Sequence, residues 1–178
     1  MRNAKLQSLM ASAVLMATGL AAPALAQTRP ASTTAQSPQP GLAIDVVRNW
    51  LIGLGAEVSE TQRQGDQTFV QVTDGAISWL LFFNACQADV CGDVQFSAVF
   101  TNETVTEARV NEWNRDNRFL KAFYSLGADG RPLAAVQYDV LIMAGLGVDQ
   151  LTDHTVLWIE LLNGFGTHIG YFAPEAAD

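Results

Sequence analysis

Apolar residues recur along this chain with two periods, one helical and one extended. Apolar residues return every three to four positions in three stretches, which predicts three amphipathic helices. The stretches are Leu42–Leu54, Thr104 to about Asn117, and one that begins at Thr152 or Asp153. Thr104 stands three residues before Glu107, the spacing of a capping box, and would begin the second helix. The residues expected to face the core are Leu42, Val46, Val47, Trp50, Leu51 and Leu54 in the first helix, Thr106, Val110 and Trp113 in the second, and Leu157, Trp158, Leu161, Leu162, Phe165 and Ile169 in the third.

Between the first two helices, and again before the third, the pattern changes to that of strands. Ile77–Cys86 is almost wholly apolar and bounded by turn residues, which predicts a central strand covered on both faces. Val94–Phe100 alternates between two sets of side chains, as a strand with one covered face does. The other predicted strands are Thr68–Thr73, Arg118–Tyr124 and Leu133–Met143, with a shorter candidate at Glu57–Thr61. These elements predict an α+β fold, an antiparallel sheet of about five strands with three helices packed on it.

The first 26 residues resemble no part of this domain. Positive charges are followed by an apolar stretch and then by small residues that end at Ala26, which is the anatomy of a secretory signal peptide cleaved after that residue. A retained membrane anchor would need about 20 predominantly apolar residues, and Pro23 argues against an uncleaved helix. We therefore expect a periplasmic protein with no membrane attachment after cleavage.

The remaining boundaries follow from composition. Residues 27–40 are rich in Pro, Ser, Thr and Gln and are expected to form a disordered linker, because such a segment buries too little apolar surface to offset its ordering entropy. The folded domain is expected to span residues 41–173, with a short tail at 174–178.

Charge excludes one class of partner. The chain carries 10 basic and 18 acidic residues, and cleavage would remove Arg2 and Lys5, which changes the net charge from −8 to −10. Nucleic-acid binding needs clustered Lys and Arg to neutralise phosphates. We therefore expect no nucleic-acid partner.

The two cysteines, Cys86 and Cys91, stand at facing ends of two predicted strands. In an exported chain an even number of cysteines predicts a disulfide, here one that closes a hairpin. The alternative is a redox-active pair, but the spacing is not Cys-X-X-Cys and no cation is adjacent in sequence. A zinc site is weaker still, because His154 and His168 lack the spacing of a ligand pair.

Two segments around the end of the second predicted helix carry a resemblance. Val110–Arg115 (VNEWNR), followed by Arg118–Phe123 (RFLKAF), resembles the signature of the YbjN family of bacterial sensory-transduction regulators. The order of elements from residue 42 to about 170 also matches, including the glycine-rich turn Gly145–Val148. The resemblance implies a fold similar to type III secretion chaperones, which bind protein segments and often pair as dimers. It implies no catalytic residue, and because this copy is predicted to be exported, a role in gene regulation is not carried over.

The ionisable residues form no catalytic motif. The chain lacks the serine elbow, the phosphate-binding loop and the HExxH helix, so we predict no catalytic residue, no cofactor and no metal site. Asp153 and His154 could form an acid–base pair, but neighbours on a helix do not face each other, which favours a capping Asp with a solvated neighbour. His168 is expected at the rim of the apolar arc. Asp139 would be a functional candidate if it faced the core, but alternation favours a solvated face or a hydrogen-bonded partner.

The composition favours a contact surface instead. With 49% hydrophobic residues the chain has more apolar surface than a small core hides, and exposed patches usually contact another protein. The polar candidates on and after the second predicted helix have two alternative roles. They hydrogen-bond to the backbone of a partner, or they bind the carbonyl groups of the helix end and of the following strand. The candidates for partner binding are Ile52, Ile159, Asn111, Asn114, Arg115 and Arg118.

We therefore predict a non-enzymatic, periplasmic, chaperone-like binding or regulatory module with an unknown protein partner, which could also form a homodimer. The alternatives are a thiol-redox protein that uses Cys86 and Cys91, and a purely structural envelope protein.

Overall fold

The computed structural model of the chain describes residues 41–75 and 77–172. The predicted signal peptide at residues 1–26, the linker at 27–40 and the tail at 174–178 lie outside these residues. Within the described part of the chain, no helix is long and apolar enough to span a membrane.

Three α-helices form where the apolar period predicts them. They are α1 (Ile44–Gly53), α2 (Glu107–Asp116) and α3 (Thr152–His168), and the short 3-10 helix η1 (Val148–Leu151) leads into α3. Each helix buries one stripe, as amphipathic helices on a sheet do. The buried residues are Ile44, Val47 and Leu51 in α1, Val110 and Trp113 in α2, and Trp158, Leu162, Phe165 and Gly166 in α3.

The strands form one antiparallel sheet with the order β2-β4-β5-β6-β8-β7, while β1 pairs with β6 and β3 pairs with β4. The sheet has eight strands, not about five, because it includes strands of only two or three residues that have no visible period. The bounds are β1 (Leu42–Ala43), β2 (Glu57–Val58), β3 (Gln62–Gln64), β4 (Gln67–Asp74), β5 (Ile77–Gln87), β6 (Val90–Thr101), β7 (Lys121–Leu126) and β8 (Pro132–Leu141).

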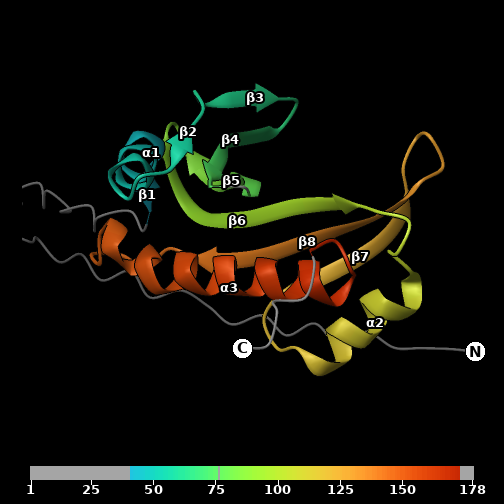
Figure 1. Cartoon of the computed structure of the whole chain (residues 1–178). Coiled ribbons are helices and arrows are strands. Elements are labelled where there is room, and N and C mark those ends of the chain that lie inside the picture. Colours follow the sequence, from blue (N-terminus) through green and yellow to red (C-terminus); the bar gives the residue numbers. More distant parts are fainter. Residues whose placement is uncertain (1–40, 76, 173–178) are drawn as a thin grey trace, which may run out of the picture. The chain divides into compact units, whose positions relative to one another are not determined.

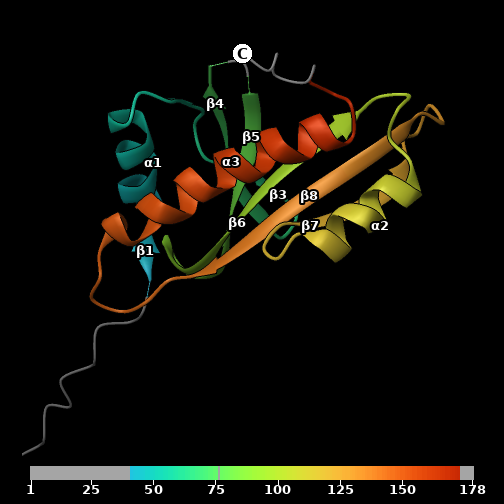
Figure 2. The ribbon, with the colours of Figure 1, turned by 60° about the horizontal axis from the view of Figure 1, so that its bottom comes forward.

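The helices cover one face of this sheet. In Figures 1 and 2, α3 runs along β6 and β8, with α1 near one of its ends and α2 near the other. Between α3 and the sheet, Trp158 packs against Trp79 and Phe96, with ring centroids 6.1 and 5.6 Å away. The opposite face of the sheet carries no helix within the described residues, and we call it the helix-free face.

This arrangement corrects the prediction that β5 is covered on both faces. Trp79, Leu81 and Phe83 point toward the helices and are at most 3% exposed. Leu80 and Phe82, on the helix-free face, are only half-buried. A run of apolar residues cannot tell a doubly covered strand from one whose second face is partly open.

Two details of the predicted helices are also wrong. The N-cap of α2 is Thr106, whose hydroxyl accepts a hydrogen bond from the backbone N–H of Arg109, while the Thr104 hydroxyl donates to the carbonyl of Ile169. In α1, Val46 and Leu54 are 47% and 59% exposed instead of buried. The helix begins at Ile44, and this residue joins Val47 and Leu51 to set a buried stripe that excludes both.

Candidate functional site

The end of α2 and the segment that leads from it to β7 contain three of the predicted partner-binding residues, Asn114, Arg115 and Arg118. Asn114 donates to the carbonyl of Ala122 and accepts from its backbone N–H, at 2.8 and 2.9 Å. Asn117 donates to the carbonyl of Trp113 at 3.1 Å, which holds the last turn of the helix. Both asparagines therefore bind backbone within the chain, the second of the two roles that the sequence left open.

The Asn114 bonds also close part of a sheet edge. In an antiparallel ladder the backbone groups of alternate residues point toward and away from the partner strand. Since Ala122 uses its N–H and C=O on Asn114, it turns them away from β8, and alternation places those of Tyr124 on the same outer side. The edge of β7 is thus blocked at Ala122 and open at Tyr124, which makes it available for pairing with another chain.

Large apolar side chains gather at this open edge. We call Phe119, Phe123, Tyr124 and Leu126 the β7 patch. Alternation along the strand puts Phe123 on the helix-free face and Tyr124 and Leu126 on the other, so the patch covers both sides of the edge. Such clustering at one edge is more than the scattered exposure that any surface shows. In the order named, the four side chains are 46%, 49%, 36% and 59% exposed.

The charges around the β7 patch differ from those of the rest of the domain. Residues 41–172 contain seven basic and 16 acidic residues, a net charge of −9, whereas residues 103–131 contain five of each and are neutral. Arg115 is paired with Asp116 at 2.9 Å, and the Arg118 guanidinium lies 5.2 Å from the centre of the Phe119 ring. The patch is therefore an apolar, electrically balanced surface on an acidic domain.

The other predicted contact residues do not join this site. Asn111 is exposed on α2, and Ile52 on α1 is 48% exposed, but α1 and α2 lie near opposite ends of α3 (Figure 2). Ile159 on α3 is half-buried and packs against the core, so its contact role stays a prediction. Sequence reasoning missed all four residues of the β7 patch, although five large apolar residues between 119 and 126 could have indicated them.

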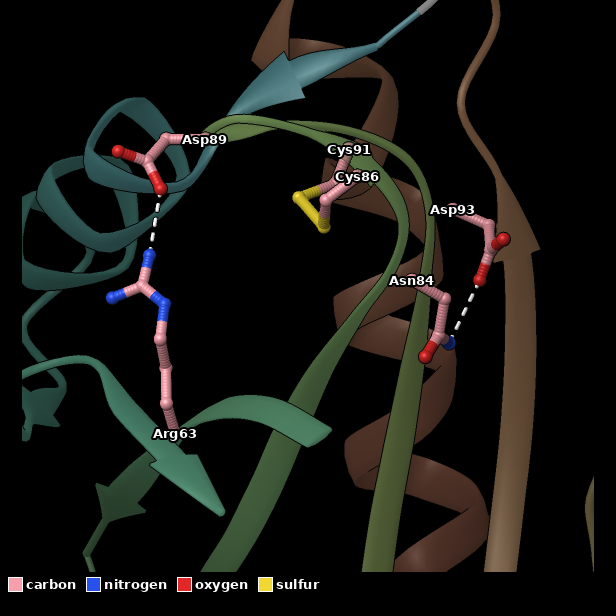
Figure 3. Close-up of a disulfide and its surroundings, with 6 residues drawn as sticks. All are labelled: Arg63, Asn84, Cys86, Asp89, Cys91 and Asp93. Atoms are coloured by element: carbon pink, nitrogen blue, oxygen red, sulfur yellow. Dashed lines mark hydrogen bonds and ion pairs between the residues drawn. A yellow bond between two sulfur atoms is a disulfide. The ribbon is translucent and has the colours of Figure 1, made fainter. Parts of the chain in front are cut away.

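The predicted disulfide is present at the tip of the β5–β6 hairpin (Figure 3). Cys86 and Cys91 are directly opposite in the ladder, with their sulfur atoms bonded and their Cα atoms 3.9 Å apart. Cys91 is 1% exposed, and its strand segment also pairs with Leu42 of β1. Asp89 in the turn accepts from Arg63 of β3 at 2.6 Å. The bridge therefore fixes the tip of the hairpin, and β1 pairs with this tip.

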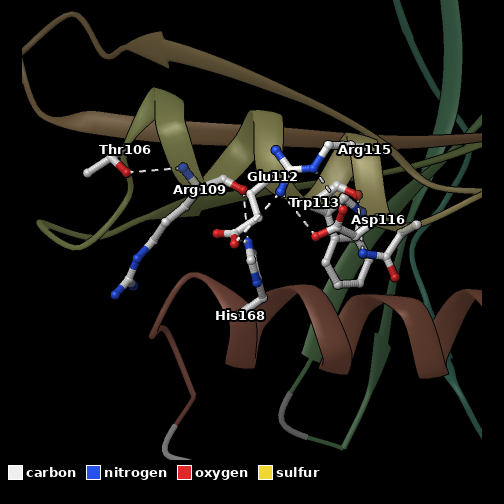
Figure 4. A network of polar contacts seen from close by, with 8 residues as sticks. Thr106, Arg109, Glu112, Trp113, Arg115, Asp116 and His168 are labelled. Carbon is white, nitrogen blue, oxygen red and sulfur yellow. Dashed lines mark hydrogen bonds and ion pairs between the residues drawn. The ribbon is translucent and has the colours of Figure 1, made fainter.

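The histidines have neighbours that sequence reasoning did not foresee. The Tyr138 hydroxyl lies 2.6 Å from Nδ1 of His154, so His154 contacts the sheet and is not merely the solvated neighbour of Asp153, which caps nothing. Burial raises the pKa of Tyr138. His168 Nε2 lies 2.8 Å from the carbonyl of Arg109 and 3.9 Å from the Glu112 carboxylate (Figure 4), which ties α3 to α2.

Asp139 lies on the helix-free face. Its carboxylate accepts hydrogen bonds from Gln95 at 2.6 Å and from Lys121 at 2.8 Å. Burial raises the pKa of Asp139, but the hydrogen bonds from Lys121 and Gln95, together with the charge of Lys121, outweigh it and keep the pKa below its usual value. Asp139 is thus part of a surface network, in agreement with the reading that alternation favoured. No group of His, Cys, Asp and Glu in the described part of the chain is arranged to hold a metal ion.

Comparison with known proteins identifies one family. The family model named YbjN, with the description "Putative bacterial sensory transduction regulator", matches residues 43–170. A solved structure titled "Crystal structure of YbjN, a putative transcription regulator from E. coli" is similar with a TM-score of 0.51 and 17% sequence identity, over 70% of this chain and 88% of that chain. Identity this low indicates a shared fold alone. No curated protein matches the chain in sequence.

Proposed function

The chain belongs to the YbjN family, whose model spans most of it, and on this premise we propose that it is a regulatory module that binds another protein through the β7 patch. The family description names regulation and not catalysis. A regulator without a reaction of its own acts through contacts, and the β7 patch combines the exposed apolar side chains and open backbone edge that protein contacts use.

The β7 patch is the observation that carries this proposal. Its four residues surround a strand edge that can pair with an incoming strand, and their rings and methyl groups supply apolar area that water solvates poorly. Neutral charge around the patch lets a partner approach a domain whose net charge is −9. That same net charge disfavours DNA, so the partner is a protein.

We place this activity in the periplasm. Support comes from the signal-peptide pattern of residues 1–26 and from the Cys86–Cys91 disulfide, which persists in oxidising compartments. The mass of the chain recovered from the periplasm should correspond to a mature protein that begins at Gln27. A cytoplasmic chain that still begins at Met1 would contradict this location.

The test of the binding surface is a pair of substitutions in the full chain. Phe123→Ser removes an exposed ring from the β7 patch, while Val156→Ser removes a side chain of similar exposure (57%) from α3. Both positions are on the surface, so the free energy of unfolding should change little, by about 0.5 kcal/mol. Phe123→Ser should abolish co-purification of the partner protein, and Val156→Ser should leave it intact.

The other outcomes separate the alternatives. Loss of self-association on Phe123→Ser would identify the partner as a second copy of the chain. Equal co-purification by both variants would contradict the proposal, because the partner would then bind through another surface. Failure of the natural chain to recover any partner would favour a purely structural envelope protein. The thiol-redox alternative predicts a Cys86–Cys91 reduction potential well above about −300 mV, whereas structural bridges lie below that value.

A further inference from the structure

The sheet is interrupted between its two central strands. β5 and β6 pair from Gln87 and Val90 to Leu80 and Ser97, and there the ladder stops. Neither strand ends at this point, because β5 stays paired with β4 to Ile77 and β6 stays paired with β8 to Thr101. We call the opening between residues 77–79 and 98–100 the seam, and Figure 2 shows β5 and β6 diverging on either side of it.

The hydrogen bonds between β4 and Ser59, just after β2, show which backbone groups of β5 face the seam. The backbone N–H of Gln71 donates to the Ser59 hydroxyl, and its C=O accepts from the Ser59 N–H, so Gln71 turns both groups away from β5. Its neighbour Val72 therefore turns toward β5 and pairs with Trp79. The next residue, Ser78, must then turn its N–H and C=O toward β6, into the seam.

The same reasoning applies from the β7 side. Ala122 turns its backbone groups away from β8, where Asn114 binds them. Alternation through the register of β7, β8 and β6 makes Ala98 and Val136 a hydrogen-bonded pair. Val99, the next residue of β6, must then turn its N–H and C=O toward β5. Ser78 and Val99 thus present unpaired backbone groups to each other across the seam.

The seam also contains space. A cavity of about 210 Å³ opens there, lined by Gln71 and by residues 78–80 and 97–99, none of which is charged. Among the lining residues, Trp79 is 3% exposed and its indole N–H has no acceptor in the described structure. Sheet edges are usually protected from other strands by charged side chains or proline, and the seam has neither.

Apolar side chains from α3 and the residues after it border the wide end of the seam. Leu162, Tyr171 and Phe172 line a second cavity of about 60 Å³ beside Ile77 and Phe100, where the ladder would otherwise continue. The rings of Phe100 and Tyr171 are 5.0 Å apart. Side chains that follow α3 therefore pack beside β5 and β6 at the point where the ladder between them would otherwise continue.

We propose that the seam binds an extended, uncharged segment of a partner polypeptide, which enters as an added strand between Ser78 and Val99. Both walls offer a backbone donor and acceptor, and the backbone of an extended segment can pair with both sides at once. The lining carries no charge, so a charged strand would lose its hydration there without gaining an ion pair. The seam shares no residue with the β7 patch, and the inference stands even if that patch binds nothing.

The test uses the full-length, ¹⁵N-labelled protein and one defined probe, the blocked peptide acetyl-Thr-Val-Thr-Val-Thr-amide. A matched peptide with N-methylated valines has nearly the same side chains but cannot donate from these positions. The first peptide should shift the amide resonances of Ser78 and Val99 and the indole resonance of Trp79. The methylated peptide should bind at least about fivefold more weakly, since one lost hydrogen bond is worth about 1 kcal/mol.

Two variants locate the binding. Leu80→Lys places a charge in the seam lining and should abolish the shifts, while Leu126→Lys places the same charge in the β7 patch and should leave them unchanged. Circular dichroism confirms that both variants fold. The reverse result would place the peptide on the β7 edge, and equal binding of the two peptides would exclude strand pairing; either overturns the inference. Exchange protection of Ser78 and Val99 at high protein concentration without peptide would show a second copy in the seam and would also overturn it.

Discussion

Gly166 and Gly164 lie two residues apart in α3, yet an added methyl group would meet very different surroundings. A Cβ at Gly166 would overlap the ring of Phe172, whereas one at Gly164 would lie 3.4 Å from the ring of Trp113, an ordinary contact. Alanine gains about 1 kcal/mol over glycine in a helix, but forced overpacking costs about 1–3 kcal/mol.

We therefore expect Gly164→Ala to raise the free energy of unfolding by up to about 1 kcal/mol. Gly166→Ala should be less stable than Gly164→Ala by at least about 1 kcal/mol, because Phe172 must leave its place. Urea unfolding monitored by fluorescence measures both values. Equal stabilisation by the two substitutions would show that Phe172 does not pack over Gly166.

Asp139 leads to a prediction about pH. Its pKa is lower in the folded chain than the usual value of about 3.9, so its carboxylate stabilises the fold at neutral pH, and this contribution is lost as pH falls through the folded-state pKa. Because Asp139 and Lys121 are half exposed, the pair is worth about 0.2–1 kcal/mol. Asp139→Asn should be less stable than the natural chain by about this amount at pH 7.

The difference between the two chains should shrink as the pH is lowered below about 4. Unfolding in urea at pH 7, 5 and 3 measures it. A difference that grows on acidification would mean that the pKa of Asp139 is raised, not lowered.

At the scale of single residues, the sequence predicts which stripe of a helix is buried but not where that stripe is centred. Trp158, Leu162, Phe165 and Ile169 are buried as predicted. Ile159 was expected at the surface, yet the core reaches it, because the width of a buried stripe depends on how closely a helix lies on its sheet. The spacing of apolar residues in the sequence does not determine the distance between a helix and its sheet.

At the scale of elements, the α2–β7 junction depends on one asparagine. Asn114 makes two hydrogen bonds to Ala122, while Asn111, one turn earlier on the same helix, is exposed. Each bond contributes about 0.5–1.5 kcal/mol, so Asn114→Ala should lower the free energy of unfolding by about 1–3 kcal/mol, and Asn111→Ala by much less. Thermal unfolding of the two variants compares them directly. A similar loss in both would mean that the hydrogen bonds to Ala122 are not responsible, since alanine has a higher helix propensity than asparagine at either position.

The β5–β6 hairpin tip provides a second test at this scale. The Cys86–Cys91 bridge closes a short loop, and in the chain-entropy model such a bridge contributes about 2 kcal/mol. Replacing both cysteines by alanine should therefore lower stability by about that amount, and reduction of the natural chain should have a similar effect. Amide exchange should increase first in β1, which pairs with the Cys91 segment. Unchanged exchange in β1 would show that the bridge does not support its docking.

The long elements could be predicted from the sequence, but of the short strands only β2 could, as part of the candidate Glu57–Thr61. β4, β5 and β6 have enough residues to reveal a period, but β1, β2 and β3 have two or three each and form only because longer strands are there to pair with. The cap at Thr106 was misplaced for a related reason: Thr104 has a distant partner in the carbonyl of Ile169, which no local motif contains.

At the scale of the whole domain, all three helices cover one face and leave the other face, the β7 edge and the seam open. The α+β class and the family resemblance were predictable from element order and from the residues around Trp113, and the family model confirms the resemblance. The β7 patch and the seam were not, because both depend on strand order and register, which pair residues as far apart in sequence as Asp93 and Leu141. The alternation of apolar residues describes each strand separately and does not predict which strands pair.

The most direct test of this account maps the contact surface itself. Hydrogen–deuterium exchange is measured on the full-length chain alone and in complex with the protein that co-purifies with it. We expect the partner to slow exchange in β7, at Tyr124 and Leu126 above all, and to leave the exposed start of α3 unchanged. Slowed exchange confined to α1 or α3, with β7 exchanging as in the free chain, would contradict a regulatory module that binds through the β7 patch.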